Sequence, residues 1–123
     1  MKLSVVIPAY NEAESIEETV TSIVDALVRE KIDHSILVVN DNSKDNTIEV
    51  LESLKQRYAT LSYVTNAGPN GFGYAVRYGL ERFDGDCVAV MMADLSDSPE
   101  DLISFYRKMV EGGFDCVFGS RFI

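Results

Sequence analysis

The sequence has few of the residues on which small metal-binding or disulfide-stabilised domains depend. Its 123 residues include two cysteines, Cys87 and Cys116, and one histidine, His34. These numbers argue against a zinc site of the Cys/His type and against a disulfide scaffold. Both cysteines fall in apolar runs, so we expect reduced core cysteines in a cytosolic protein, and we expect His34 to be a loop residue before a strand.

Long apolar runs are absent as well. The mean hydropathy is 0.00, and no run approaches the roughly 20 apolar residues that span a bilayer. The apolar stretch near Met1 is too short for a signal peptide, and Pro8 and Glu12 interrupt it. We therefore expect a cytoplasmic domain that does not cross a membrane.

Basic residues are in the minority. Lys and Arg number 11 against 20 Asp and Glu, which gives a net charge of −9. Such a surface is unsuited to nucleic acid, so no nucleic-acid partner is expected. Any phosphate must be held locally, by backbone amides, a metal ion or a placed arginine.

Short apolar runs alternate with amphipathic helical patterns along the whole chain, without a repeat or linker, which predicts one domain over residues 1–123. The runs are largely continuous, as in strands buried on both faces of a parallel sheet. They are Leu3–Ile7, Ile36–Val39, Leu61–Val64, Cys87–Met92 and Cys116–Phe118. The order βαβαβαβαβ predicts an α/β domain with a mainly parallel sheet flanked by helices.

Three helix starts carry local signals. Asn11 with Glu14 resembles a capping box for the first helix. Asp45 is the expected N-cap of the second helix, and Pro99 is expected at the first position of the fourth. The third helix is the weakest prediction because its apolar stripe contains Gly79.

The loops that follow the strands are where a ligand is expected, because open α/β sheets bind ligands at the carboxyl ends of their strands. Asp41 follows the second strand, where a carboxylate can accept the ring N–H of a nucleobase; the alternative is a capping or turn aspartate. Gly68 and Gly71 serve turns or allow a ligand close to the backbone. The Gly71–Gly73 segment lacks the dinucleotide fingerprint, so nicotinamide binding is rejected.

Two acids follow the most apolar strand. Asp94 and Asp97 flank Ser96 there, and carboxylates at a strand end suit Mg²⁺ or Mn²⁺, which in turn binds a diphosphate. For Asp97 the alternative is a surface turn acid near the last helix.

Five motifs, in order and across the whole chain, resemble the family 2 glycosyltransferases, whose GT-A fold is Rossmann-like and binds nucleotide sugars. The motifs are Val5–Glu12, Val38–Thr47, Gly71–Ala75, Ala93–Asp97 and Phe118–Phe122. The Asp-Leu-Ser segment and the Gly-Ser-Arg segment are most similar to those of dolichol- or polyprenol-phosphate mannosyltransferases. The resemblance implies that the chain is the N-terminal, nucleotide-binding part of a longer fold.

The resemblance also implies roles for individual residues. Asp94 would be the metal-binding acid of the Asp-x-Asp motif and Arg121 would lie near the phosphates. The residues implied to bind the nucleotide sugar are Pro8, Tyr10, Glu12, Asp41, Gly71 and Arg121, and those implied to be catalytic and metal-binding are Asp94 and Asp97. The implied reaction moves a sugar, with inversion, from a nucleoside diphosphate to an acceptor. A polyprenyl phosphate at the cytoplasmic membrane face would need no general base, since its oxygen is already ionised.

Two positions depart from the family pattern. Asn40 stands where the family usually has the first of two aspartates, and Met92 replaces the first acid of Asp-x-Asp. Because methionine is a poor ligand for Mg²⁺ or Mn²⁺, the cation would rest on Asp94, with Asp97 as a second ligand and the diphosphate completing the shell.

The sequence leaves one alternative function open and disfavours two others. A non-catalytic nucleotide-sugar-binding module or inactive fragment would bind the donor without sugar turnover. A sugar nucleotidyltransferase is disfavoured because the Pro8–Glu12 loop has neither glycine nor a basic residue. A receiver domain is disfavoured because paired acids do not follow the first strand.

Overall fold

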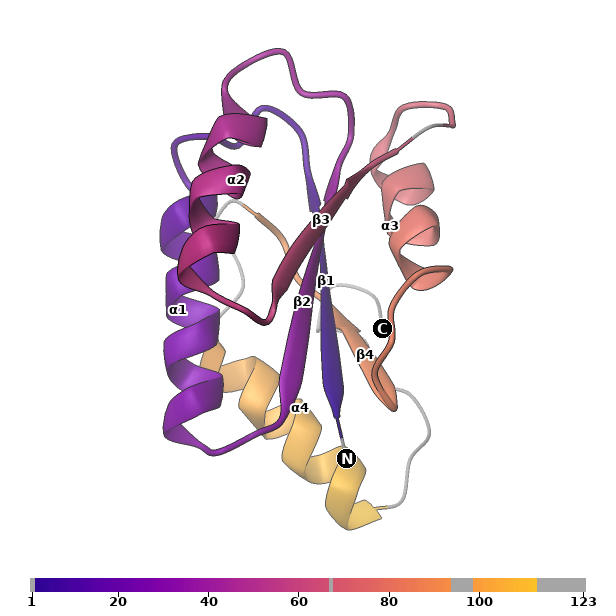
Figure 1. Cartoon of the computed structure of the whole chain (residues 1–123). Coiled ribbons are helices and arrows are strands. Elements are labelled where there is room, and N and C mark those ends of the chain that lie inside the picture. Colours follow the sequence, from indigo (N-terminus) through magenta and orange to yellow (C-terminus); the bar gives the residue numbers. More distant parts are fainter. Residues whose placement is uncertain (1, 67, 94–98, 113–123) are drawn as a thin grey trace.

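A computed structural model of the chain describes residues 2–66, 68–93 and 99–112 (Figure 1). Strands and helices alternate as predicted through this part of the chain. They are β1 (Leu3–Ala9), α1 (Ile16–Arg29), β2 (His34–Asn40), α2 (Thr47–Arg57), β3 (Leu61–Thr65), α3 (Phe72–Leu80), β4 (Cys87–Val90) and α4 (Pro99–Gly112). The fifth predicted strand, Cys116–Phe118, lies outside the described residues.

The strands form one parallel sheet in the order β3-β2-β1-β4. The chain progresses from β1 to β3 and then returns to the other side of β1 to form β4. Because such crossovers are right-handed, this reversal moves the connecting helix to the opposite face. Accordingly, α1 and α2 cover one face and α3 covers the other (Figure 1). The reversal between β1 and β4 is where α/β sheets of this kind open a ligand-binding crevice.

Both faces of the sheet are packed with apolar side chains, which explains why the strands read as continuous apolar runs. On the side of α1, α2 and α4 the core includes the fully buried Ile7, Ile23 and Leu51. A smaller layer, in which Val6 and Val39 are also fully buried, packs under α3. No helix among the described residues is long and apolar enough to cross a bilayer.

Gly79 brings α3 close to the sheet. A Cβ at this position would lie 2.5 Å from Cγ1 of Val6 and 3.0 Å from Cγ2 of Val39. The glycine that weakens the helical pattern in the sequence is therefore the point at which the helix packs on the sheet.

β2 and β3 extend one or two residues beyond the predicted runs, and the ends of β1 and β4 differ for a reason that involves Pro8. β1 continues through Pro8 to Ala9, and this is tolerated because the missing N–H of Pro8 would point toward β4, whose pairing with β1 ends at Val90. β4 itself ends at Val90, because the next hydrogen bond of its ladder with β1 would need an N–H that Pro8 lacks. From there the chain turns toward α1.

Three local predictions are corrected by the structure. His34 is the buried first residue of β2, and its Nδ1 lies 2.9 Å from the carbonyl oxygen of Ile32. The Asn11–Glu14 capping box is wrong, because α1 begins at Ile16 after Ser15. Asp45 is not the N-cap of α2, since Asn46 occupies that place. The expected start of α4 at Pro99 is confirmed.

Candidate functional site

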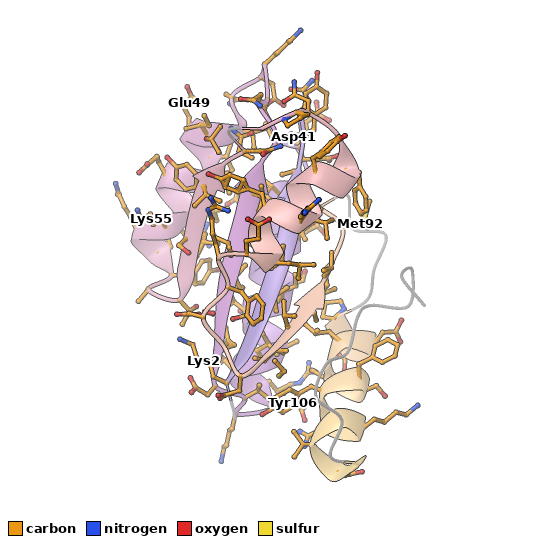
Figure 2. The ribbon with its side chains drawn as sticks, turned by 90° about the vertical axis from the view of Figure 1, so that its right-hand side faces the viewer. Lys2, Asp41, Glu49, Lys55, Met92 and Tyr106 are labelled. Atoms are coloured by element: carbon orange, nitrogen blue, oxygen red, sulfur yellow. The ribbon has the colours of Figure 1, made fainter. Side chains whose placement is uncertain are left out.

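A cavity of about 460 Å³ opens at the carboxyl edge of the sheet, at the topological reversal between β1 and β4. Its walls come from the ends of β1 and β2, the start of α3 and the segment after β4. The lining residues are Pro8, Ala9, Tyr10, Glu12, Asp41, Asn70, Gly71, Phe72, Ala75, Met92 and Ala93. Figure 2 shows Asp41 at this end of the sheet and Met92 beside α3, with Lys2 at the opposite end.

The cavity brings together five residues that the sequence predicted for the site. Pro8, Tyr10, Glu12, Asp41 and Gly71 all line it. Their binding roles stay predictions. The other predicted site residues, Asp94, Asp97 and Arg121, lie outside the described part of the chain. Six further lining residues were not predicted to bind the nucleotide: Ala9, Asn70, Phe72, Ala75, Met92 and Ala93. Of these, Ala9, Asn70 and Phe72 stand directly beside residues that were predicted to bind it.

Asp41 is buried and its carboxylate is fixed by two donors. Oδ1 accepts a hydrogen bond from Nδ2 of Asn66 at 3.0 Å, and Oδ2 accepts one from the N–H of Gly71 at 2.7 Å. Asp41 therefore holds the loop between β3 and α3, which is the turn role that the sequence left open. A carboxylate has about four acceptor positions, so this role leaves acceptor capacity for a ligand.

Gly71 has the backbone conformation that glycine adopts far more readily than other residues. Its φ of 136° and ψ of 153° place it just before α3 and aim its N–H at Asp41. Gly71 thus serves the turn into α3, which is one of the two roles that the sequence left open, and its contact with a ligand stays a prediction. Any side chain here would strain the backbone and would disturb the contact with Asp41.

The β1–α1 loop is tied to the β2–α2 loop by side chains that accept backbone amides. The N–H of Asn11 donates to Oγ of Ser43 at 3.0 Å, and the N–H of Glu12 donates to Oγ1 of Thr47 at 3.2 Å. Asp45 accepts the N–H of Ala13 at 3.3 Å, and its hydrogen bond from the Thr47 hydroxyl is the main cause of the lowered pKa of this carboxyl. These ties fix the wall that carries Tyr10 and Glu12.

The segment that leads to Asp94 is anchored by α1. The carbonyl oxygen of Ala93 lies 3.0 Å from Oγ1 of Thr19, which donates to it, and 2.9 Å from Oγ of Ser15. Ser15 Oγ also lies 2.9 Å from Oε2 of Glu12. Two adjacent walls of the cavity are thus joined through α1.

The described residues do not form a cation site by themselves. No group of three or more His, Cys, Asp and Glu side chains among them could hold a metal ion. Of the carboxylates that line the cavity, Asp41 is already engaged by two donors, which leaves Glu12, and Met92 contributes a soft thioether. The metal-binding roles of Asp94 and Asp97 stay predictions, because both residues lie outside the described part of the chain.

Asn40, the departure from the family pattern next to Asp41, is almost completely buried. Its Oδ1 accepts the N–H of Ser43 at 3.1 Å, whereas its Nδ2 has no hydrogen-bond partner within the described structure. An aspartate would make the same contact through an oxygen and would leave no amide donor without a partner. Asn40 does not line the cavity.

The chain is similar to known glycosyltransferases along its whole length. The model of Glycosyl transferase family 2 matches residues 4–123. A dolichol-phosphate mannosyltransferase of Pyrococcus furiosus is 36% identical over 123 residues, which are 100% of this chain and 34% of that protein. An uncharacterized glycosyltransferase of Synechocystis is 33% identical over 121 residues, or 98% of this chain and 38% of that protein. The chain spans about a third of the length of these relatives.

Solved structures share the fold. A mannosyltransferase from Pyrobaculum calidifontis, in complex with GDP-Man and Mn²⁺, superposes with a TM-score of 0.74 at 25% identity, covering 87% of this chain and 32% of that chain. A glucosyl-3-phosphoglycerate synthase from Mycobacterium tuberculosis, in complex with UDP, gives 0.72 at 26% identity, covering 89% and 40%. The expected GT-A fold is confirmed.

Proposed function

The chain belongs to glycosyl transferase family 2, and on this premise we propose that its cavity binds the nucleoside diphosphate of a sugar donor whose sugar is transferred to an acceptor. The observation that carries the proposal is the position of Asp41. Its fixed carboxylate lines a cavity of about 460 Å³ at the topological reversal of the sheet, which is where α/β proteins bind nucleotides.

The chemistry of Asp41 favours some bases over others. A carboxylate is an acceptor, so its partner must present a donor. Uracil has a ring N–H at N3 and guanine has one at N1, whereas adenine and cytosine carry a lone pair at the corresponding atom. The relatives solved with GDP-Man and with UDP contain these two bases. Pro8, Tyr10, Glu12 and Gly71 would form the surrounding wall.

The diphosphate needs positive charge that the described cavity does not supply. Its lining residues include no Lys, Arg or His, and the chain as a whole carries a net charge of −9. We assign this task to Arg121 and to Mg²⁺ or Mn²⁺ held by Asp94 and Asp97. When bound, such a cation stabilises the charge that develops on the leaving diphosphate. The Pyrobaculum mannosyltransferase was solved with Mn²⁺.

For the acceptor we propose a polyprenyl phosphate at the cytoplasmic membrane face. The similarity to a dolichol-phosphate mannosyltransferase supports this choice. A phosphate oxygen forms the new bond to the anomeric carbon while the bond from that carbon to the diphosphate oxygen breaks, and attack from the opposite face inverts the configuration. The attacking oxygen carries no proton, so no general base is needed.

Calorimetric titration with GDP, UDP and ADP, with and without Mn²⁺, tests the donor site. We expect GDP or UDP to bind, and ADP to bind more weakly. Asp41→Asn should weaken the preferred nucleotide about 10- to 100-fold, because a hydrogen bond to a charged group contributes about 1.5–3 kcal/mol. Asp25→Asn, which removes the same charge from the exposed side of α1, should change nothing. Thermal unfolding of each variant shows that the fold is retained.

Two results would contradict the proposal: wild type that binds neither GDP nor UDP, or Asp41→Asn that binds them as tightly as wild type. The cation ligand is tested separately with Asp94→Asn, in which Mn²⁺ should no longer raise nucleotide affinity. Sugar turnover above background then distinguishes a transferase from a non-catalytic binding module.

A further inference from the structure

Asn66 is a hub of hydrogen bonds behind the cavity wall. It follows β3 directly and is 3% exposed. Its N–H donates to the carbonyl of Asn40 at 2.9 Å and its Oδ1 accepts the N–H of Gly68 at 3.1 Å. Its Nδ2 donates to Oδ1 of Asp41 at 3.0 Å and to the carbonyl of Pro69 at 2.9 Å. Every polar group of its side chain is thus engaged.

The contact between Asn66 and Asp41 does more than hold a turn. The Gly71 N–H fixes Oδ2 of Asp41, and the Asn66 amide fixes Oδ1. Two donors at two oxygens set the rotation of the carboxylate about its last bond. With one of these donors removed, the carboxylate could turn and present its lone pairs in other directions.

We propose that Asn66 is a positioning residue for base recognition: it does not line the cavity, but it orients the Asp41 carboxylate so that its remaining lone pairs accept a base N–H. The inference rests on the proposed function of this cavity. It assigns the preference for guanine or uracil over adenine or cytosine to the pair Asp41–Asn66 and not to Asp41 alone. Asn66 itself touches no base.

The substitution Asn66→Asp probes this role with little change in shape. It replaces the donating amide with a carboxylate oxygen that faces Oδ1 of Asp41, so the two oxygens repel each other unless a proton lies between them. Asn66→Ser removes the donor without adding charge. Asn46→Asp is the matched control, since it adds the same charge at an exposed position before α2, outside the cavity.

The readout is base discrimination, which is the ratio of the Kd for ADP to the Kd for the preferred nucleotide. We expect Asn66→Asp and Asn66→Ser to lower this ratio at least tenfold while the Kd for ADP stays near its wild-type value. Loss of folded protein would reduce the number of binding sites but not this ratio. Asn46→Asp should retain the wild-type ratio.

A double variant controls for the case in which Asn66→Asp does not fold. In the double variant Asp41→Asn/Asn66→Asp the hydrogen bond between these two residues is kept with its direction reversed, although the Pro69 carbonyl still loses its donor. The double variant should therefore be more stable than Asn66→Asp alone, but base discrimination should not return. Folded Asn66 variants with wild-type discrimination would overturn the inference and leave the proposed function intact. Wild type that binds no nucleotide would overturn both.

Discussion

Gly79→Ala should destabilise the protein, although it replaces a glycine in a helix by the best helix former. The added Cβ would lie 2.5 Å from Cγ1 of Val6 and 3.0 Å from Cγ2 of Val39. Both valines are fully buried in central strands, and their short branched side chains have little freedom to move away. The helix must therefore shift away from the sheet or the strands must deform.

The magnitude follows from two opposing effects. Overpacking of a well-packed core costs about 1–3 kcal/mol, and the change from glycine to alanine in a helix returns up to about 1 kcal/mol. We expect a net loss of up to about 2 kcal/mol in the free energy of unfolding. A Cβ added at Gly73, in the same helix, would meet no atom within 4 Å, so Gly73→Ala should instead stabilise by about 0.5–1 kcal/mol.

Urea denaturation followed by circular dichroism measures both variants against wild type. A double-mutant cycle identifies the side chain responsible: in a Val6→Ala background, where both Cγ atoms are missing, Gly79→Ala should cost at least about 1 kcal/mol less. If Gly79→Ala is as stable as Gly73→Ala, or if its cost is the same in both backgrounds, close packing of α3 on Val6 is not the reason for this glycine.

Two further predictions concern the ends of the sheet. The double substitution Ser15→Ala/Thr19→Val removes both hydroxyl partners of the Ala93 carbonyl and should lower the free energy of unfolding, measured in urea, by about 1–3 kcal/mol. Ser22→Ala on the same helix is the control and should cost little. Equal losses in the two variants would show that these hydroxyl groups do not anchor the segment after β4. At the opposite edge of the sheet, a hydrogen bond from Ser35 and, to a smaller extent, one from Lys2 lower the pKa of Asp84. The ionised Asp84 therefore adds to the free energy of unfolding at pH values above its pKa in the unfolded chain, and this stabilisation is lost as the pH falls through its lower pKa in the folded protein. The stability difference between wild type and Asp84→Asn should therefore be largest at neutral pH and disappear in acid, and a difference that persists in acid would contradict this origin.

The periodic features of the fold could be predicted from the sequence because they depend on burial alone. Continuous apolar runs identified β1, β2 and β4, which are buried on both faces, as well as the partly exposed edge strand β3, and the alternating order predicted the parallel sheet. The prediction that Gly79 weakens the third helix missed its contact with Val6, because helix periodicity contains no information on how closely a helix approaches a sheet. His34 was misplaced for a similar reason, since its ring contacts the carbonyl of Ile32 and the hydroxyl of Thr60, and strand pattern shows neither contact.

The candidate site could be predicted in part. The position after a strand singled out Asp41, the resemblance to family 2 glycosyltransferases added Tyr10 and Glu12, and the structure places all three around one cavity. Asn66 was not singled out, although it stands in one of the same loops. An asparagine after a strand is an ordinary turn residue in sequence, and only the fold shows that its amide reaches the carboxylate of Asp41.

The two failed cap predictions show how the carboxyl edge is held in place. Asn11 and Asp45 have the chemistry of helix caps, which bind amides of their own helix. Here Oδ1 of Asn11 accepts the N–H of Lys44 at 2.7 Å, and Oδ2 of Asp45 accepts the N–H of Ala13 at 3.3 Å. Each side chain thus binds the loop of the neighbouring strand, and Asp45 does so while its Oδ1 also accepts the N–H of Thr47, the first residue of α2, at 3.0 Å. Such ties order the two loops relative to each other before any ligand arrives. A nucleotide that enters the cavity then meets a wall that is already formed, and less of its binding free energy is lost in ordering Tyr10 and Glu12.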